Sequence, residues 1–140
     1  MEQKYAGDVS VNQAWETLQQ DPSAALLDVR TIPEFQFVGV PDLSGIGKET
    51  HFLPWQVYPQ MQVNPDFVEA VKLAGMDEDQ PIYILCRSGV RSISAAIALT
   101  AAGFKNCFNV EQGFEGPPDG SGHRGKVAGW KSAGIPWKQS

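Results

Sequence analysis

The sequence predicts a single α/β domain built around a parallel sheet. Segments with strand and helix patterns alternate along the 140 residues, which favours parallel strands joined by right-handed helical crossovers. Residues 81–85 form a continuous apolar run without alternation, which is typical of a central strand buried on both faces. The length fits one domain, so we expect residues 1–140 to fold as one unit.

The first helix and strand follow from local signals. Ser10 and Gln13 have the spacing of a capping box, and apolar residues recur after them at helical intervals. This pattern predicts an amphipathic helix over residues 11–20. The apolar run at 24–29 ends in a polar Asp-Val-Arg sequence, which predicts a buried strand whose end reaches a loop.

A second capping box, formed by Thr31 and Glu34, predicts a short helix through Phe37. Prolines and glycines then interrupt residues 38–63, for which we expect a long irregular connection. Its apolar residues Phe52, Leu53 and Trp55 suggest that a short piece packs on the core.

The second half of the chain returns to regular patterns. Asn64 before Pro65 predicts a helix start, with Phe67, Val68, Val71 and Ala74 on its apolar face. We expect a helix over 93–102 and a strand over 106–110, and a last helix over 124–133.

Composition limits the classes of function. The chain has 11 basic and 16 acidic residues, a net charge of −5 and a pI near 4.9, which disfavours nucleic acid as a partner. Two cysteines and two histidines are too few for a disulfide framework or a structural metal cluster. We expect no membrane span, because no apolar run is long enough, and a cytoplasmic location, because the first residues are polar.

One segment departs from the overall acidity. Residues 80–110 contain three basic side chains, Arg87, Arg91 and Lys105, and no acidic ones. This local field favours a small anion as ligand, although the chain as a whole is negative.

The strongest chemical signal lies between the strand at 81–85 and the following helix. Ligands bind at the carboxyl ends of strands in open α/β sheets, and backbone N–H groups that turn into a helix start can hold an anion. Nearby arginines and the helix dipole favour the thiolate of a cysteine placed there. The segment consists of Cys86, Arg87, Ser88, Gly89, Val90, Arg91 and Ser92.

Residues 86–91 resemble the six-residue active-site loop of single-domain rhodaneses, which are persulfide-forming sulfurtransferases. Further similarities to this family cover most of the chain and occur at residues 26–30, at Glu34–Phe35, at 109–114 and at 130–136. Two segments depart from the pattern. Residues 39–45 lack the usual Gly-His-Ile-Pro-Gly-Ala type of turn, and 117–124 is longer than in the smallest members, which leaves the substrate open.

The resemblance implies a three-layer α/β/α sandwich with a central five-stranded parallel sheet. It implies that Cys86 takes a sulfane sulfur from thiosulfate or a persulfide donor and passes it to cyanide or a thiol, without a cofactor or metal. The loop N–H groups from Arg87 to Ser92 would stabilise the persulfide, and Arg87 would attract the anionic donor. Arg91 would either do the same or pair with Asp28.

Asp28 and Arg30 are expected to organise the loop. Two alternative functions remain. Cysteine phosphatases and arsenate reductases also use a cysteine and an arginine, but they need five residues between the two, and Cys86 and Arg91 are separated by four. A sulfur-relay or regulatory module would be loaded by a protein partner, such as a sulfur carrier. Residues 38–63 with Phe52 and Trp55 would then form a docking surface, although aromatic residues there more often complete the core.

The remaining candidates carry weaker signals. Cys107 has no nearby cations in its strand pattern, so we expect it to serve packing. Residues 120–125 match a dinucleotide fingerprint but follow no apolar strand, so we expect a loop. His123 is expected to be a solvated loop residue, with a role in acceptor binding as the alternative.

Overall fold

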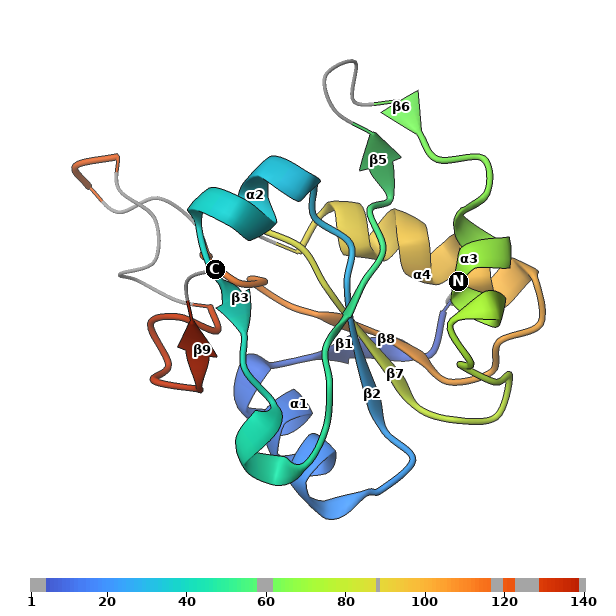
Figure 1. Cartoon of the computed structure of the whole chain (residues 1–140), viewed down its shortest axis with the longest axis horizontal. Coiled ribbons are helices and arrows are strands. Elements are labelled where there is room, and N and C mark those ends of the chain that lie inside the picture. Colours follow the sequence, from blue (N-terminus) through green and yellow to red (C-terminus); the bar gives the residue numbers. More distant parts are fainter. Residues whose placement is uncertain (1–4, 58–61, 88, 117–119, 123–128, 139–140) are drawn as a thin grey trace.

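A twisted parallel sheet runs through the centre of the molecule (Figure 1). The computed structural model describes residues 5–57, 62–87, 89–116, 120–122 and 129–138. The strands of the sheet, in chain order, are β1 (Gly7–Val9), β2 (Ala25–Asp28), β4 (His51–Phe52), β7 (Ile82–Leu85) and β8 (Cys107–Val110). Their spatial order is β1-β8-β7-β2-β4, and all neighbouring pairs are parallel. The expected five-stranded parallel sheet is confirmed, and β7 is its central strand.

Helices cover both faces of this sheet. The described helices are α1 (Val11–Gln20), α2 (Ile32–Phe37), α3 (Phe67–Leu73) and α4 (Arg91–Ala101). In Figure 1, α1 lies on one side of the sheet, while α2, α3 and α4 lie on the other. This arrangement is the α/β/α sandwich that the sequence predicts.

Alternate side chains of β7 pack in two separate apolar clusters, one on each face of the sheet. Ile82 and Ile84 pack in a cluster with residues of α3 and α4, whereas Tyr83 and Leu85 pack in a cluster with residues of α1. Because successive side chains of a strand point to opposite faces, both faces of β7 are buried. The absence of polar alternation in residues 81–85 therefore has a direct physical cause.

The first two helices begin where the capping boxes predict. The Gln13 N–H donates to Ser10 Oγ at 3.1 Å, and the Ser10 N–H donates to Gln13 Oε1 at 2.9 Å. At the start of α2, the Thr31 N–H and hydroxyl both donate to Glu34 Oε1, at 3.1 and 3.0 Å. These contacts satisfy N–H groups that a helix leaves unpaired at its first turn.

Residues 38–63 are more regular than the sequence predicts. They contain β4, which pairs with β2, and three further short strands together with a 3₁₀ turn. β3 (Val40–Pro41) pairs with β9 (Trp137–Lys138) and β5 (Gln56–Val57) with β6 (Gln62–Val63), while Ser44–Ile46 forms the turn. The strands are too short to carry a period-2 pattern, so only their pairing partners define them. Leu53 and Trp55 pack against the core, as expected.

Three local expectations are wrong. α3 begins after Asp66 and not after Asn64, whose side chain instead accepts the Asp66 N–H at 3.0 Å. Ala74 is exposed, because the helix has ended before it. Residues 129–134 form turns and not a helix, and residues 124–128 of that expected helix lie outside the described residues.

Candidate functional site

Cys86 lies immediately after β7, and the loop that follows it leads into the first turn of α4. The residue is only 1% exposed, and its Sγ accepts the Gly89 N–H at 3.1 Å. Gly89 has φ +94°, a conformation that residues with a Cβ disfavour, and a Cβ there would lie 3.0 Å from the Gln112 backbone nitrogen. The positive end of the α4 dipole, at the start of the helix, also favours negative charge on this sulfur. The geometry therefore places a sulfur where negative charge is stabilised.

The turn after β8 is hydrogen-bonded to the backbone of the Cys86 loop. The Phe114 N–H donates to the Cys86 carbonyl at 2.8 Å, and the N–H groups of Glu115 and Gly116 donate to the Arg87 carbonyl at 3.0 and 3.1 Å. Gly113 has φ +61°, and a Cβ there would overlap the Cys86 carbonyl. The loop thus has a tightly fitted backbone support.

Arg91 is engaged by a partner that the sequence analysis does not predict. Its Nη1 and Nη2 donate to the two carboxylate oxygens of Glu34 at 2.7 and 2.9 Å. Neither the outward orientation nor the pairing with Asp28 is observed, because Glu34 at the start of α2 lies closer. Burial alone would raise the pKa of Glu34. The hydrogen bonds and positive charge of Arg91, together with the hydrogen bonds from Thr31, instead hold this pKa below its ordinary value.

Asp28 and Arg30 form a fully buried ion pair beside the loop. Arg30 Nε donates to both carboxylate oxygens at 2.9 and 3.1 Å, Nη2 donates to Oδ2 at 2.7 Å, and both side chains are 0% exposed. The Arg30 guanidinium also lies 4.3 Å from the centre of the Phe114 ring. Phe114 therefore contacts both the Arg30 guanidinium, with its ring, and the Cys86 carbonyl, with its N–H.

A polar network behind Cys86 was missed at the sequence level. The Ser92 Oγ lies 3.2 Å from Cys86 Sγ and donates to Asn109 Oδ1, and Asn109 Nδ2 donates to Asp8 Oδ1 at 2.9 Å. Ser92 and Asn109 are 0% and 2% exposed. The available signal was a polar residue, Asn109, inside an otherwise apolar strand next to β7.

The other predicted loop residues have different surroundings. Arg87 is exposed, Val90 is 70% exposed and Gly89 is buried. Ser88 lies outside the described residues, as does His123. The described part of the loop therefore presents Arg87 to solvent while Cys86 and Gly89 lie inside.

Cys107 is also buried, in an apolar cluster with the Thr100 side chain as a polar neighbour. It is the first residue of β8 and belongs to the cluster that includes Ile82 and Leu99. Burial raises the pKa of the Cys107 thiol to about 11. Such a raised pKa disfavours the thiolate at neutral pH, in line with the expected packing role of Cys107.

Comparison with known proteins assigns the family. A family model described as the STR4 middle domain matches residues 6–140. The crystal structure of Rv0390 from M. tuberculosis superimposes with a TM-score of 0.89 at 43% identity, covering 97% of this chain and 99% of that one. Rhodanese-like domain-containing protein 17 of Arabidopsis thaliana is 36% identical over 109 residues, which is 76% of this chain and 64% of that protein. The chain belongs to the rhodanese-like family.

Rhodanese-like proteins include sulfurtransferases. The thiosulfate sulfurtransferase GlpE of Actinobacillus succinogenes is 27% identical to this chain over 129 residues, covering 92% of this chain and 87% of that protein. The rhodanese-like domain described here thus has sulfurtransferase relatives at low identity.

The described residues of this rhodanese-like domain suggest neither a metal centre nor a membrane span. Among them, no three His, Cys, Asp or Glu side chains are grouped so that they could hold a metal ion. None of the described helices has the length and apolar character needed to cross a bilayer.

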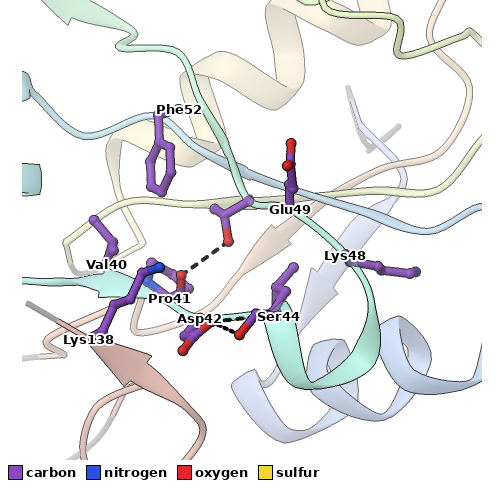
Figure 2. A pocket seen from close by; sticks show the side chains of 10 residues that line it. Val40, Pro41, Asp42, Ser44, Lys48, Glu49, Phe52 and Lys138 are labelled. Carbon is purple, nitrogen blue, oxygen red and sulfur yellow. Dashed lines mark hydrogen bonds between the residues drawn. The ribbon is translucent and has the colours of Figure 1, made fainter. Parts of the chain in front are cut away.

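A separate groove, with a volume of about 450 Å³, is lined by other segments of the chain. Figure 2 shows the side chains that line it. Phe52, which is 40% exposed, lines it together with Asp42, Lys48, Glu49 and Lys138. None of its lining residues belongs to the Cys86 loop. The groove mixes charges of both signs, so it indicates no particular partner.

Proposed function

We propose that this protein is a sulfurtransferase that carries a sulfane sulfur on Cys86. The observation that carries the proposal is the position of Cys86 Sγ at the end of the central strand, where it accepts the Gly89 N–H beside the start of α4. This arrangement supplies a nucleophile and a place for negative charge within one short loop. Membership of a family that includes sulfurtransferases supports the same conclusion.

The reaction has two steps. The Cys86 thiolate attacks the outer sulfur of thiosulfate, a new S–S bond forms, and the original S–S bond breaks with its electron pair leaving on sulfite. A nucleophilic acceptor, either cyanide or a thiolate, then attacks the terminal sulfur of the Cys86 persulfide and takes it away. The electron pair of the broken S–S bond returns to Cys86 as a thiolate, so no cofactor or metal is required.

The two arginines of the loop have separate roles. Arg87 is exposed and carries the positive charge that an anionic donor meets first. Arg91 is held by Glu34 and acts on the site as a fixed charge. In a phosphatase the loop arginine must bind the phosphate, whereas the guanidinium of Arg91 is bound to Glu34. This ion pair and the short loop both favour sulfur transfer over phosphoryl transfer.

The acceptor in a reducing, cytoplasmic setting would be a cellular thiol or a sulfur-carrier protein. A donor that is itself a protein persulfide would make the domain a relay module with the same chemistry at Cys86. Measuring transfer from thiosulfate and from a persulfidated protein side by side distinguishes these two donors. A relay module would react much faster with the protein persulfide.

The central test is a thiosulfate–cyanide assay of the wild-type protein, with thiocyanate as the product. We expect turnover with ping-pong kinetics, and intact-mass measurement after thiosulfate treatment should find one added sulfur on Cys86. Cys86→Ser should abolish both signals, while Cys107→Ser, the matched control, should retain them. Persulfide formation in Cys86→Ser, or its absence from the wild type with every donor, would overturn the proposal.

A further inference from the structure

The network behind Cys86 runs from the sulfur along the α4 face of the sheet to its edge strand β1. It runs from Cys86 Sγ through Ser92 and Asn109 to Asp8, whose Oδ1 also accepts the Tyr5 hydroxyl at 2.8 Å. Ser92 and Asn109 are buried, whereas Asp8 is exposed. Buried polar side chains of this kind need defined partners, so the direction of each hydrogen bond can be worked out.

The carboxylate of Asp8 fixes those directions. An ionised carboxylate only accepts, so the Asn109 amide must turn its Nδ2 toward Asp8 and its Oδ1 toward Ser92. Oδ1 also only accepts, so the single Ser92 hydroxyl proton is donated to Asn109. The Ser92 oxygen can then only accept from Cys86, which requires that the sulfur carries a proton.

A thiolate at Cys86 reverses the last requirement. It has no proton to donate and needs donors of its own, of which the Gly89 N–H at 3.1 Å is one. The Ser92 Oγ, 3.2 Å from Sγ, becomes the second donor when its hydroxyl rotates about the Cβ–Oγ bond. The Cys86 proton leaves to solvent, the hydroxyl changes its acceptor, and no covalent bond of Ser92 is broken.

We propose that Ser92 is a positioning residue whose hydroxyl switches between Asn109 Oδ1 and Cys86 Sγ, and that Asn109, oriented by Asp8, competes with the thiolate for this proton. The inference deepens the proposed function, because it concerns how the nucleophile of that reaction is stabilised. Ser92 favours the thiolate, and Asn109 opposes it.

Charged groups around the site define the background of this switch. Arg87 and Arg91 belong to the loop, where Glu34 pairs with Arg91 and the buried Asp28 pairs with Arg30, while Asp8 and Glu111 lie beside Gly89. Asp8, Gly89, Asn109 and Glu111 line a surface depression of about 400 Å³, so the outer end of the network meets solvent. Neutral replacements of Ser92 and Asn109 leave all these charges in place.

The test is the pH dependence of the rate at which iodoacetamide alkylates Cys86 in the full chain. Ser92→Ala removes a donor to the thiolate, so the pH of the half-maximal rate should rise by about one unit. Asn109→Leu removes the competing acceptor, so this pH should fall, by about half a unit. Ser94→Ala, the same change at an exposed position of α4, is the matched control and should leave it unchanged.

Shifts of opposite sign from two adjacent residues separate the switch from a packing defect, which would move both variants the same way or neither. Equal-sign shifts, or none, would overturn the proposal. If Asn109→Leu does not fold, the wild type still provides a measurement. The Asn109 side-chain amide resonance in ¹⁵N NMR should shift with the same pH midpoint as the alkylation rate, and it should lose that transition in Cys86→Ser. An amide signal that ignores the ionisation of Cys86 contradicts the switch.

The alkylation profile does not depend on sulfur transfer. A wild-type protein without transfer activity would refute the proposed function and leave the hydroxyl switch to be judged by its own data.

Discussion

The two cysteines lie at opposite ends of neighbouring strands and are both buried, yet their environments differ. Cys86 is 1% exposed and follows β7, and Cys107 is 0% exposed and begins β8. Sγ of Cys86 has a backbone N–H donor and a hydroxyl within hydrogen-bond distance. Cys107 lies in an apolar cluster with the Thr100 side chain beside it, and burial raises its pKa to about 11 although the hydrogen bond with Thr100 lowers it.

Burial alone therefore does not decide the chemistry of a thiol. The decisive difference is which end of the strand the cysteine occupies. The carboxyl end of β7 meets the start of a helix and a loop of N–H groups, whereas the amino end of β8 meets apolar core. The following predictions test this contrast, beginning with the largest effect.

The first prediction concerns the relative reactivity of the two thiols. With a pKa of about 11, Cys107 is ionised to only about one part in 10⁴ at pH 7, so iodoacetamide should label Cys86 at least about 100-fold faster. Peptide mass mapping at successive times measures both rates. In denaturant the two rates should become similar, and equal rates in the native protein would contradict the contrast.

Gly113→Ala should distort the loop at Cys86 and leave the surroundings of Cys107 unchanged. The new Cβ would overlap the Cys86 carbonyl and lie 2.7 Å from the Arg87 backbone, at a φ of +61°. We expect a loss of about 3 kcal/mol or more in the free energy of unfolding, and slower alkylation of Cys86.

The matched control for this variant is Gly122→Ala. Gly122 also has a positive φ, +82°, but a Cβ there would meet open space. Its cost should be about 1 kcal/mol, because only the backbone conformation is disfavoured. Equal costs for the two variants in urea unfolding would mean that the close packing behind Cys86 does not matter.

Glu34→Gln should loosen the loop by removing the partner of Arg91. The two side chains are 17% and 19% exposed, so we expect a loss of about 1–3 kcal/mol in the free energy of unfolding. The exposed pair of Lys105 and Asp79 provides the control, and Asp79→Asn should have no measurable effect. Wild-type stability of Glu34→Gln would refute a supporting role for this ion pair.

The smallest effect is the pH dependence that Glu34 contributes. The pKa of Glu34 in the folded state lies below its ordinary value of 4.5. The stabilisation that ionised Glu34 gives to the folded state is therefore complete above pH 4.5, and it is lost as the pH falls through the lowered pKa. The difference in unfolding free energy between wild type and Glu34→Gln should therefore shrink on acidification below 4.5. A difference that stays constant or grows in acid would show that another group is responsible.

The parts of the fold that depend on neighbouring residues could be predicted from the sequence. The capping boxes at Ser10 and Thr31 define helix starts because both partners lie within four residues. The apolar run that became β7 shows double burial directly. By contrast, β4 has two residues and exists because it pairs with Leu27 and Asp28, which no local pattern reveals.

The candidate site shows the same division. The Cys86 loop could be recognised because its residues are contiguous, but the partners of Arg91 and Ser92 come from elsewhere. Glu34 precedes Arg91 by 57 residues, and Asn109 follows Ser92 by 17. Which acidic residue reaches Arg91 depends on how α2 lies beside the start of α4, and sequence spacing alone does not provide that information.

The backbone support of the Cys86 loop determines when its N–H dipoles become oriented. The N–H groups of Phe114, Glu115 and Gly116 donate to the carbonyls of Cys86 and Arg87. A peptide unit is rigid and trans, so holding the Cys86 carbonyl on one side of the loop sends the Arg87 N–H to the other side. The dipoles are therefore aligned when the chain folds. In the proposed sulfur transfer, each cycle would begin with a polarised site, and the energy of donor binding would not be needed to build it.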